Sequence, residues 1–460
     1  MNSLGDMLVL GLGRSGRAAV SVALRLIADG GARSVTAVDG AESPELLRIA
    51  DELRALGVPV TLGATQVAGH FDVCVASPGI PPADELMKSA HAVSDRVISE
   101  VELAFVLSSH PWVAVTGTNG KTTTTALITH LLNTAGIAAR SVGNFGPPAV
   151  EAVAEAQPSE VMVAEVSSFQ LTHVDTFHPR VAVLLNITPD HLNWHGSLES
   201  YSAAKARVFE NLDAGDTAVV NVDDEGSLPY AQSLEDRGIP VVRVSCREAH
   251  VSGARVASGM LELETRGGTV RLVDADELQI RGSHNVSNAL AAAAAAHALG
   301  ASPAALRTGL TTFAPIEHRL EPVDEVDGAE WFNDSKATNP DAVFKALTAF
   351  SDRPLVLLLG GRNKDNDLRP LAREVSACAK AAVLFGEARV EFAEAFAGLP
   401  IHTVEAVSLS DACEAARALA EPGDAVVLSP ACASFDEFTS YEQRGAVFKS
   451  RVAEMAGGGR

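Results

Sequence analysis

The run Thr116-Gly117-Thr118-Asn119-Gly120-Lys121-Thr122-Thr123 has the residue types that bind a chain of phosphates. Its glycines let the backbone turn tightly and aim N–H groups at one point, and the start of a following helix adds partial positive charge. Lys121 can reach terminal phosphates, and the Thr122 hydroxyl can ligate Mg²⁺. The generic pattern has glycine where this chain has Val115, so an ordinary glycine turn is the alternative. We expect an ATP site, because strand, loop and helix follow in the required order.

A second glycine cluster, Gly11-Leu12-Gly13-Arg14-Ser15-Gly16, follows an apolar run near the N-terminus. It resembles a dinucleotide fingerprint with its glycines closer together, and Asp39 ends the next apolar run, where a ribose-binding acid lies in such folds. Read alone, the cluster favours an NAD-dependent oxidoreductase. A site for another diphosphate nucleotide, such as a UDP-sugar, and a purely structural turn are the alternatives.

Three further side chains with chemical potential follow the phosphate loop. Glu165 ends an apolar run, His191 comes just after another, and Lys205 lies in the helical stretch 201–209. Each has an ordinary explanation by itself, as a helix cap, a hydrogen-bonded histidine or a solvated lysine. Together they occupy successive strand ends of one expected sheet, which places them near the phosphates. Hard oxygen or nitrogen ligands of this kind suit a metal site.

Short apolar runs alternate with helical stretches along the whole chain, and most end in Gly, Asp, Asn or Ser. The runs are 7–10, 35–38, 73–76, 112–115, 161–164, 181–185, 217–220, 355–359, 381–385 and 425–428. Continuous apolar strands between helices indicate parallel sheets covered on both faces. Ligands gather at the carboxyl ends of such strands, where the polar residues above lie. The predicted fold class is therefore α/β with mainly parallel sheets.

The length of 460 residues suggests about three domains. One boundary is expected near Ser108-Ser109-His110-Pro111, before the strand that feeds the phosphate loop, and another near Phe313-Ala314-Pro315. We therefore expect domains at 1–108, 109–315 and 316–460. The first and third should be Rossmann-like, and the central one should be a phosphate-loop ATPase domain.

Composition excludes several classes of protein. The net charge of −22 repels nucleic acid and anionic membranes at long range, so neither is an expected partner. The five cysteines are odd in number and far apart, which favours a reducing cytoplasm over a disulfide framework. The N-terminus lacks the pattern of a signal peptide, and the longest apolar run, 289–299, is too short to span a bilayer.

Taken in order, these motifs resemble the Mur ligase superfamily over essentially the whole chain. The loop at 116–123 matches that family's nucleotide loop, which accounts for Val115. Within the family the chain resembles the branch that adds D-glutamate. The motifs are 11–16, 77–80, 116–123, 143–144, 165–171, 190–191, 201–205, 284–288, 317–319, 333–339 and 429–436. The last two are the most specific. Asn193-Trp194 departs from the Asp-Arg that many members carry.

The resemblance implies ATP-dependent amide formation, in which D-glutamate is joined to UDP-N-acetylmuramoyl-L-alanine through an acyl phosphate during peptidoglycan precursor synthesis. The enzyme would be a cytoplasmic carbon–nitrogen ligase, and we expect a monomer. The first domain would bind UDP near Arg14, Ser15, Gly16 and Asp39. Ser77 and Asn144 would help to position the muramoyl part.

The resemblance also implies ATP and two Mg²⁺ ions in the central domain. Gly117 to Thr123 would hold the phosphates, and Asn285 and Asn288 would contact adenine. Thr122 and Glu165 would serve one ion, and His191 and Lys205 the other. In relatives the lysine that matches Lys205 is carbamylated, which turns a cation into a carboxylate-like ligand.

The resemblance implies that Arg319 and Asp334, both from the third domain, contact ATP. The residues expected around D-glutamate are Lys336, Thr338, Lys364, Ser434, Phe435 and Tyr441. Lys121, Glu165, His191, Lys205 and Arg319 are the expected catalytic residues. Three alternatives stay open at this point: a sister ligase for another amino acid, an NAD-dependent oxidoreductase, and a non-enzymatic protein gated by ATP.

Overall fold

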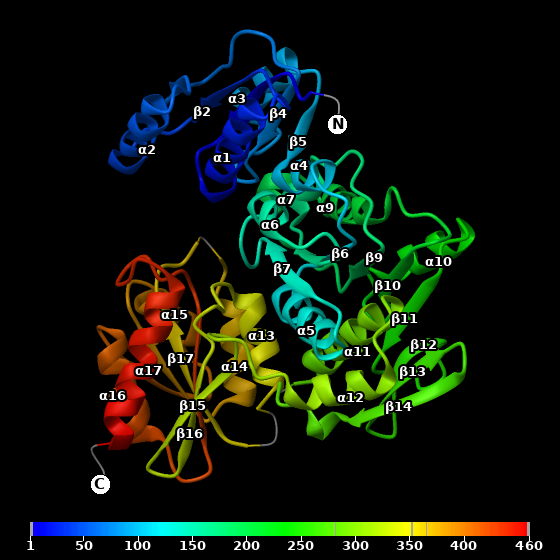
Figure 1. Cartoon of the computed structure of the whole chain (residues 1–460). Helices are drawn as coiled ribbons and strands as arrows, with labels where there is room; N and C mark the ends of the chain where they lie inside the picture. Colours follow the sequence, from blue (N-terminus) through cyan, green and yellow to red (C-terminus); the bar gives the residue numbers. More distant parts are fainter. Residues whose placement is uncertain (1–2, 281, 351–352, 365, 458–460) are drawn as a thin grey trace. The chain divides into compact units, whose positions relative to one another are not determined.

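The computed structural model describes residues 3–280, 282–350, 353–364 and 366–457 (Figure 1). Three sheets, mainly parallel, alternate with helices along the chain, so the α/β prediction is confirmed. The chain divides into two compact units. The first comprises Met1–Glu277 and Ser287–Thr311, and the second comprises Leu278–Val286 and Thr312–Arg460.

The first sheet has five parallel strands in the order β3-β2-β1-β4-β5. Its strands are β1 (Asp6–Leu10), β2 (Ser34–Val38), β3 (Val60–Thr61), β4 (Val73–Ala76) and β5 (Val97–Ser99). Its helices are α1 (Arg14–Ala28), α2 (Pro44–Ala55), α3 (Glu85–Val93) and α4 (Glu100–Val106). A Cβ at Gly16 would lie only 1.8 Å from the carbonyl oxygen of Gly11, so α1 can start this close to β1 only with glycine there.

The second sheet has nine strands in the order β14-β13-β12-β11-β10-β9-β6-β8-β7. The strands are β6 (Trp112–Thr116), β7 (Ala139–Gly143), β8 (Val161–Glu165), β9 (Val181–Leu184), β10 (Thr217–Asn221), β11 (Val241–Ser245), β12 (Gly253–Ala257), β13 (Met260–Thr265) and β14 (Gly268–Asp274). β12 to β14 pair antiparallel, which sequence analysis did not predict. Their faces are partly exposed, so they lack the continuous apolar run by which buried parallel strands are recognised.

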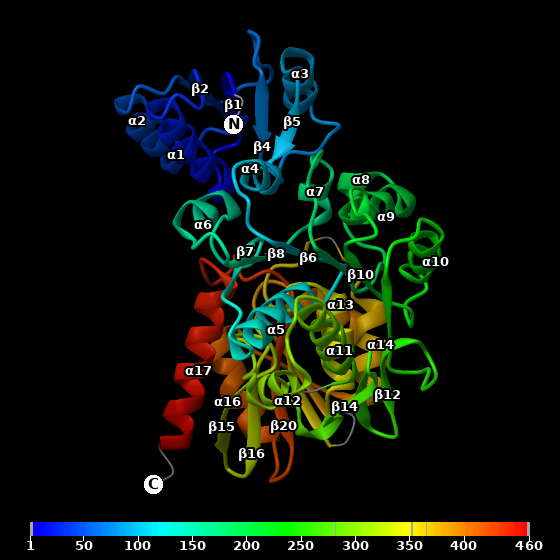
Figure 2. The same cartoon turned by 45° about the vertical axis from the view of Figure 1, so that its right-hand side comes forward.

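Helices of the central region follow these strands closely. They are α5 (Lys121–Thr134), α6 (Ala149–Glu155), α7 (Ser168–Leu171), α8 (Leu192–His195), α9 (Leu198–Ala206), α10 (Leu228–Asp236), α11 (Ser283–Ala298) and α12 (Pro303–Thr312). Two short 3₁₀ turns, η1 (Arg207–Phe209) and η2 (Ala275–Glu277), complete the region. In both side views α11 lies beside α5, the helix that starts at the phosphate loop (Figures 1 and 2).

The third sheet has the order β15-β16-β20-β17-β18-β19, and only the pair β15–β16 is antiparallel among its strand pairs. The strands are β15 (Glu321–Val326), β16 (Ala329–Asn333), β17 (Leu355–Gly360), β18 (Ala381–Phe385), β19 (His402–Glu405) and β20 (Ala425–Ala431). The helices are α13 (Pro340–Thr348), α14 (Arg369–Cys378), α15 (Arg389–Phe396), α16 (Leu409–Leu419) and α17 (Tyr441–Gly457).

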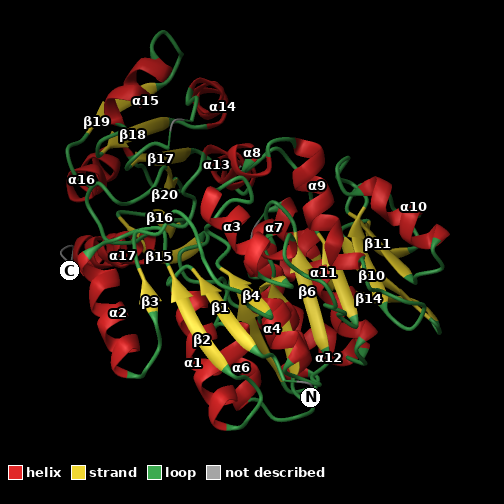
Figure 3. Cartoon of the chain, turned by 90° about the horizontal axis from the view of Figure 1, so that it is seen from above, coloured by secondary structure: helices red, strands yellow, loops and turns green. Residues whose placement is uncertain are grey.

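Both faces of this third sheet are buried. Along β17, Leu357 and Leu359 belong to one apolar cluster, and Val356 and Leu358 belong to another on the opposite face. Figure 3 shows helices flanking the strands. Side chains alternate across a strand, so a strand buried on both faces reads as a continuous apolar run, as the sequence predicted.

Each expected domain, 1–108, 109–315 and 316–460, contains one of the three sheets. The first two sheets nevertheless fall in one compact unit and share an apolar cluster that includes Val9 and Trp112. The exact domain boundaries therefore stay a prediction. In the described part of the chain, none of the helices has the length and apolar character needed to cross a membrane.

Candidate active site

The phosphate loop lies where sequence analysis expected it, between β6 and α5. Gly117 and Gly120 have φ of 155° and 83°, a region that side chains other than glycine rarely adopt. A Cβ at Gly120 would lie 2.4 Å from Asn288 Oδ1, so α11 presses against the loop. Thr122 and Thr123 occupy the first turn of α5, whose N–H groups face the loop. This geometry suits an anion with several phosphates.

Two residues from the neighbouring strand end brace the loop. Asn186 Oδ1 accepts a hydrogen bond of 2.8 Å from the Asn119 N–H, and the Asn186 amide donates to the Asn119 carbonyl at 3.1 Å. Thr118 Oγ1 donates to the Thr188 carbonyl at 3.1 Å and accepts from the Thr188 N–H at 3.0 Å. Sequence analysis assigned no role to Asn186 or Thr188. Their position just after β9 is the signal that could have identified them.

Thr122 and Glu165 meet at the carboxyl end of the sheet. Glu165 pairs with Val115 in the register of β8 with β6, which places its side chain beside the loop. Thr122 Oγ1 donates to Glu165 Oε2 at 2.7 Å, and Asn144 Nδ2 donates to Glu165 Oε1 at 2.8 Å. Glu165 is 3% exposed. A hydroxyl and a carboxylate are the hard oxygen donors that Mg²⁺ prefers, so this pair fits the expected ion.

Lys205 is almost completely buried, with 1% of its surface exposed. Its Nζ donates to the Gly117 carbonyl at 2.7 Å and lies 4.6 Å from the centre of the Tyr201 ring. The Tyr201 hydroxyl in turn donates to Thr118 Oγ1 at 3.1 Å. Burial holds the pKa of Lys205 well below its ordinary value, and nearby Lys121 lowers it further. Asp190 and Glu165 act in the opposite direction, but burial dominates, so this amine loses its proton more easily than an exposed lysine does.

His191 and Lys121 are two more side chains that sequence analysis expected to serve catalysis. His191 has φ of 53°, contacts Phe169 with ring centres 4.8 Å apart, and keeps 48% of its side chain exposed. Its Nε2 is 3.5 Å from Asp190 Oδ2. Lys121 Nζ donates to the Gly117 and Thr118 carbonyls at 2.9 Å each. Both side chains are accessible to a ligand, because neither is fully buried.

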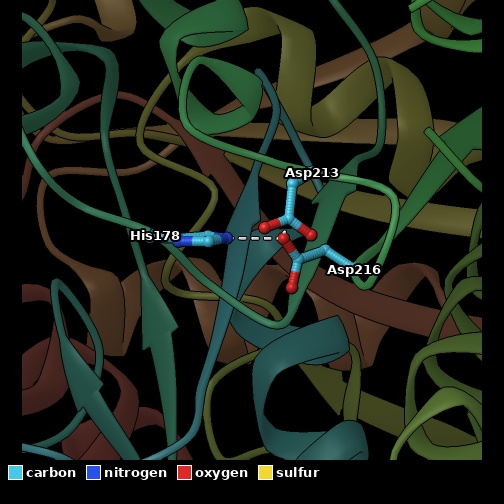
Figure 4. Close-up of side chains that lie close together, drawn as sticks. All are labelled: His178, Asp213 and Asp216. Carbon is cyan, nitrogen blue, oxygen red and sulfur yellow. Dashed lines mark hydrogen bonds and ion pairs between the residues drawn. The ribbon is translucent and has the colours of Figure 1, made fainter. Parts of the chain in front are cut away.

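The described residues contain two clusters of possible metal ligands elsewhere, His178–Asp213–Asp216 and Glu317–His318–Glu321. Figure 4 shows the first, in which Asp216 accepts a hydrogen bond from His178. Asp216 also accepts a hydrogen bond from the backbone N–H of Asp213. These residues precede β9 and β10, at the edge of the sheet opposite the phosphate loop. Arg180 also lies 3.5 Å from Asp216. We interpret the cluster as a structural contact that links the start of β9 to the start of β10.

A cavity of about 560 Å³ lies at the carboxyl edge of the first sheet, and its lining includes Gly11, Gly13, Asp39, Ser77 and Gly79. Asp39 Oδ2 accepts from the Leu12 N–H at 2.7 Å, and Asp39 Oδ1 accepts from the Ala41 N–H at 2.8 Å. Asp39 therefore shapes the glycine turn as well as facing the cavity.

Other residues expected to bind the UDP substrate lie at the same edge of the first sheet as this cavity. Arg14, Ser15 and Gly16 form the first turn of α1. The Arg14 guanidinium donates to the Gly146 carbonyl. This contact brings the first turn of α1 to the 144–146 loop, which also carries Asn144. The two substrate regions named by sequence analysis are thus joined within one unit.

In the second unit, Asp334 follows β16 and is buried. Its Oδ2 accepts from Ser429 Oγ at 2.7 Å, and its Oδ1 accepts from the Leu320 N–H at 3.4 Å. Burial raises the pKa of Asp334 to about 7, against the opposing effects of the Ser429 hydrogen bond and nearby Arg319. Arg319 is therefore close enough to Asp334 to influence its pKa, and the expected contact of both residues with ATP stays a prediction.

The expected D-glutamate residues also lie in the second unit, on three loops and the start of α17. Lys336 Nζ lies 5.1 Å from the centre of the Tyr441 ring, and both side chains are partly exposed. Ser434 is buried, whereas 61% of Phe435 is exposed, which is unusual for a large apolar side chain. Thr338 is partly exposed, and Lys364 is exposed on the loop after β17.

The two asparagines expected at adenine lie three residues apart on α11. Asn288 contacts the phosphate loop within the first unit, as described above. Asn285 belongs to the second unit and is also buried.

Comparison with known families and proteins gives two kinds of match. The family models for the Mur ligase middle domain and for the Mur ligase, glutamate ligase domain match residues 115–296 and 318–432. Among curated relatives, the UDP-N-acetylmuramoylalanine--D-glutamate ligase of Pelotomaculum thermopropionicum is 43% identical over 455 residues, which cover 98% of each chain. The proteins of the same name from Salinibacter ruber and Syntrophus aciditrophicus are 41% and 39% identical, with 97% and 98% of each chain covered.

Solved structures with the same fold are more distant in sequence. A pseudomurein peptide ligase type C from Methanothermus fervidus has a TM-score of 0.60 at 18% identity, with 98% of this chain and 99% of that chain covered. The UDP-N-acetylmuramate-alanine ligase of Thermotoga maritima has a TM-score of 0.59 at 18% identity and the same coverage.

Proposed function

The chain belongs to the UDP-N-acetylmuramoylalanine--D-glutamate ligase family of the Mur ligases, and from this membership we propose how its residues carry out the reaction. The enzyme uses ATP to join D-glutamate to UDP-N-acetylmuramoylalanine during peptidoglycan synthesis. The observation that carries the proposal for the site is the Thr122–Glu165 pair at a braced phosphate loop. We further propose that it acts as a monomer in the cytoplasm.

The alanyl carboxylate of the substrate first has to be activated, because oxide is a poor leaving group. We propose that this carboxylate attacks the γ-phosphorus of ATP, which forms an acyl phosphate and releases ADP. Lys121 stabilises the charge that develops on the transferred group, and the N–H groups of the loop hold the adjacent phosphates. Exclusion of water protects the acyl phosphate from hydrolysis.

The amine of D-glutamate then attacks the acyl carbon. The tetrahedral intermediate expels phosphate, and the amine loses a proton, so an amide and inorganic phosphate result. Lys336, Thr338, Lys364, Ser434, Phe435 and Tyr441 are proposed to surround D-glutamate. Lysines and hydroxyls suit a substrate with two carboxylates, because they donate hydrogen bonds to an anion. Arg319 and Asp334 are proposed to act on ATP.

Two Mg²⁺ ions are proposed, which would neutralise phosphate charge when bound. Thr122 and Glu165 would hold one, and their hydroxyl and carboxylate fit it chemically. His191 and Lys205 would hold the other. A protonated lysine has no lone pair for a metal, and the buried Lys205 amine of lowered pKa is suited to adding CO₂, which would turn it into an anionic oxygen ligand. That addition forms an N–C bond, releases one proton and leaves a carbamate.

The substrate's nucleotide and sugar are proposed to lie along the first sheet. The cavity beside Asp39 and Ser77 would take the UDP part, with Arg14, Ser15 and Gly16 close by. Asn144 would contact the muramoyl part, and its hydrogen bond to Glu165 would link that contact to the ATP site. Asn285 and Asn288 are proposed to contact adenine.

The oxidoreductase alternative fits less well, because it explains neither the phosphate loop nor the matches to the Mur ligase family. A sister ligase for another amino acid is the nearer competitor. Phosphate release with UDP-N-acetylmuramoyl-L-alanine and ATP separates the possibilities when D-glutamate, L-glutamate, L-lysine and diaminopimelate are compared. We expect release only with D-glutamate. Equal or greater release with another amino acid would overturn the proposed specificity.

A further inference from the structure

Arg444, in the first turn of α17, is completely buried in the second unit. Among the residues that the structure describes, no carboxylate forms an ion pair with it within 4.0 Å. Burial lowers the pKa of Arg444 to about 10, so the guanidinium stays charged at neutral pH. Removing a cation from water costs roughly several kcal/mol, and the carboxylates of Asp436, Asp334 and Glu437 offset part of this cost from beyond ion-pair distance, so the hydrogen bonds of the guanidinium decide where it lies.

The guanidinium instead bonds the backbones of two separate segments. Its Nε donates to Ser335 Oγ at 3.0 Å, and one terminal nitrogen donates to the Ser335 carbonyl at 2.8 Å. Both terminal nitrogens donate to the Cys432 carbonyl at 3.1 Å. Ser335 Oγ closes the network by donating to the Tyr441 carbonyl at 2.8 Å. One planar cation therefore fixes segment 335–338 to segment 432–435.

The network is closely packed on the side of Gly361. A Cβ at Gly361 would lie 2.9 Å from a terminal nitrogen of Arg444 and 2.2 Å from the Ala433 carbonyl oxygen. Ala431, at the end of β20, has φ of 60°, which is strained for a residue other than glycine. The segment around Cys432 thus follows an unusual path, and the guanidinium holds it there.

These two segments carry most of the residues proposed for D-glutamate. Lys336 and Thr338 directly follow Ser335, Ser434 and Phe435 directly follow Cys432 and Ala433, and Tyr441 precedes Arg444 by less than one helical turn. Resting on the function proposed above, we infer that Arg444 is a positioning residue that sets the separation of the two D-glutamate-binding segments. It acts through Ser335 and Cys432 and does not touch the substrate.

Steady-state kinetics of the full-length enzyme tests this role. Arg444→Lys keeps the charge, but an ammonium cannot span Ser335 and Cys432 as a planar guanidinium does. Loss of two or more charged hydrogen bonds should raise the KM for D-glutamate by about 10-fold or more, with the KM values for ATP and the UDP substrate within about 2-fold of wild type. Arg451→Lys is the matched control, because Arg451 lies on the same helix and pairs with Glu414 and Glu454.

A purely structural role predicts a different pattern. Arg444→Lys would then lower the melting temperature and kcat while all three KM values stay unchanged, and that result would overturn the inference. Ser335→Ala provides a second variant if Arg444→Lys does not fold, because it removes only the hydroxyl that links Arg444 to Tyr441. It should raise the D-glutamate KM by a smaller factor, and an unchanged KM there also counts against the inference.

Failure of the underlying function gives a separate result. If wild-type enzyme releases no phosphate with D-glutamate, the proposed function is wrong. If wild type is active with D-glutamate and both variants keep its KM, only the role of Arg444 is wrong.

Discussion

The Thr122 hydroxyl donates a hydrogen bond of 2.7 Å to Glu165 Oε2, although the two residues are 43 positions apart. The contact joins the first turn of α5 to the end of β8. Parallel pairing of β6 with β8 makes it possible, because the carboxyl ends of both strands meet at one edge. A hydroxyl and a buried carboxylate at the mouth of a phosphate loop form the chemical centre of the proposed ATP site.

Loss of the loop lysine should stop the reaction. We predict that Lys121→Ala lowers kcat by about 10³-fold or more, because removal of one charged donor to the transferred group commonly costs this much. Phosphate release with all three substrates measures it. Lys88→Ala is the control, because Lys88 is exposed and pairs with Glu85 on α3. Near-normal turnover of Lys121→Ala would sink the mechanism.

The metal dependence should follow the Thr122 hydroxyl. We predict that Thr122→Val raises the Mg²⁺ concentration for half-maximal activity by about 10-fold, since valine keeps the shape but supplies no oxygen. Thr125→Val, one turn along α5 and also buried, should leave that concentration unchanged. A Mg²⁺ titration of activity compares them. Equal shifts in both variants would point to a general effect on the helix.

Lys205 provides a test of the carbamate. Lys205→Ala should be inactive and partly recover in a short carboxylate such as acetate, which can take the place of the carbamate. Activity is measured against acetate concentration. Lys121→Ala serves as control, because acetate cannot replace a cation. Without any recovery, the carbamate is unsupported, while the roles of Lys121 and Thr122 are untouched.

Glu100 should make stability depend on pH. It is buried on α4, where Glu100 Oε1 accepts from the Val150 N–H at 2.6 Å, and burial raises its pKa to about 7. Between the ordinary pKa of a glutamate and the raised pKa of Glu100, the folded state keeps a proton that the unfolded state has already released. The free energy of unfolding should therefore fall as pH rises from about 5 to about 8.

Glu100→Gln should flatten this part of the stability curve, and Glu155→Gln on the exposed side of α6 should not. Urea denaturation at several pH values measures the change in the free energy of unfolding. That change is at most roughly a few kcal/mol for a pKa shift of this size. Identical slopes in wild type and Glu100→Gln would show that the carboxyl is not protonated in the folded protein.

Much of the fold was predictable from sequence, because a strand buried on both faces is a continuous apolar run. The runs at 7–10, 112–115 and 355–359 all begin or end within two residues of the observed strands. The antiparallel strands β12 to β14 lack that signal, since none of them is buried along its whole length. The apolar core that the first two sheets share could not be predicted from the sequence either, because it depends on contacts between residues far apart in the chain.

The site residues also differ in whether a local signal in the sequence marks them. The placement of Lys121 and Glu165 beside the phosphate loop could be predicted from local signals, a glycine loop and a polar residue at a strand end. Arg444 could not, because an arginine in a helix is usually solvated and nothing near it in sequence shows that α17 buries it. Asn186 lay next to a predicted strand end, yet its partner Asn119 is 67 residues away.

Transfer of oxygen from the substrate to phosphate tests the central claim most directly. UDP-N-acetylmuramoyl-L-alanine is labelled with ¹⁸O in its alanyl carboxylate, and the phosphate released with ATP and D-glutamate is analysed by mass spectrometry. If the loop at Thr116–Thr123 presents ATP to that carboxylate, each released phosphate carries one oxygen from the carboxylate. Unlabelled phosphate, with the amide formed at the usual rate, would contradict the account.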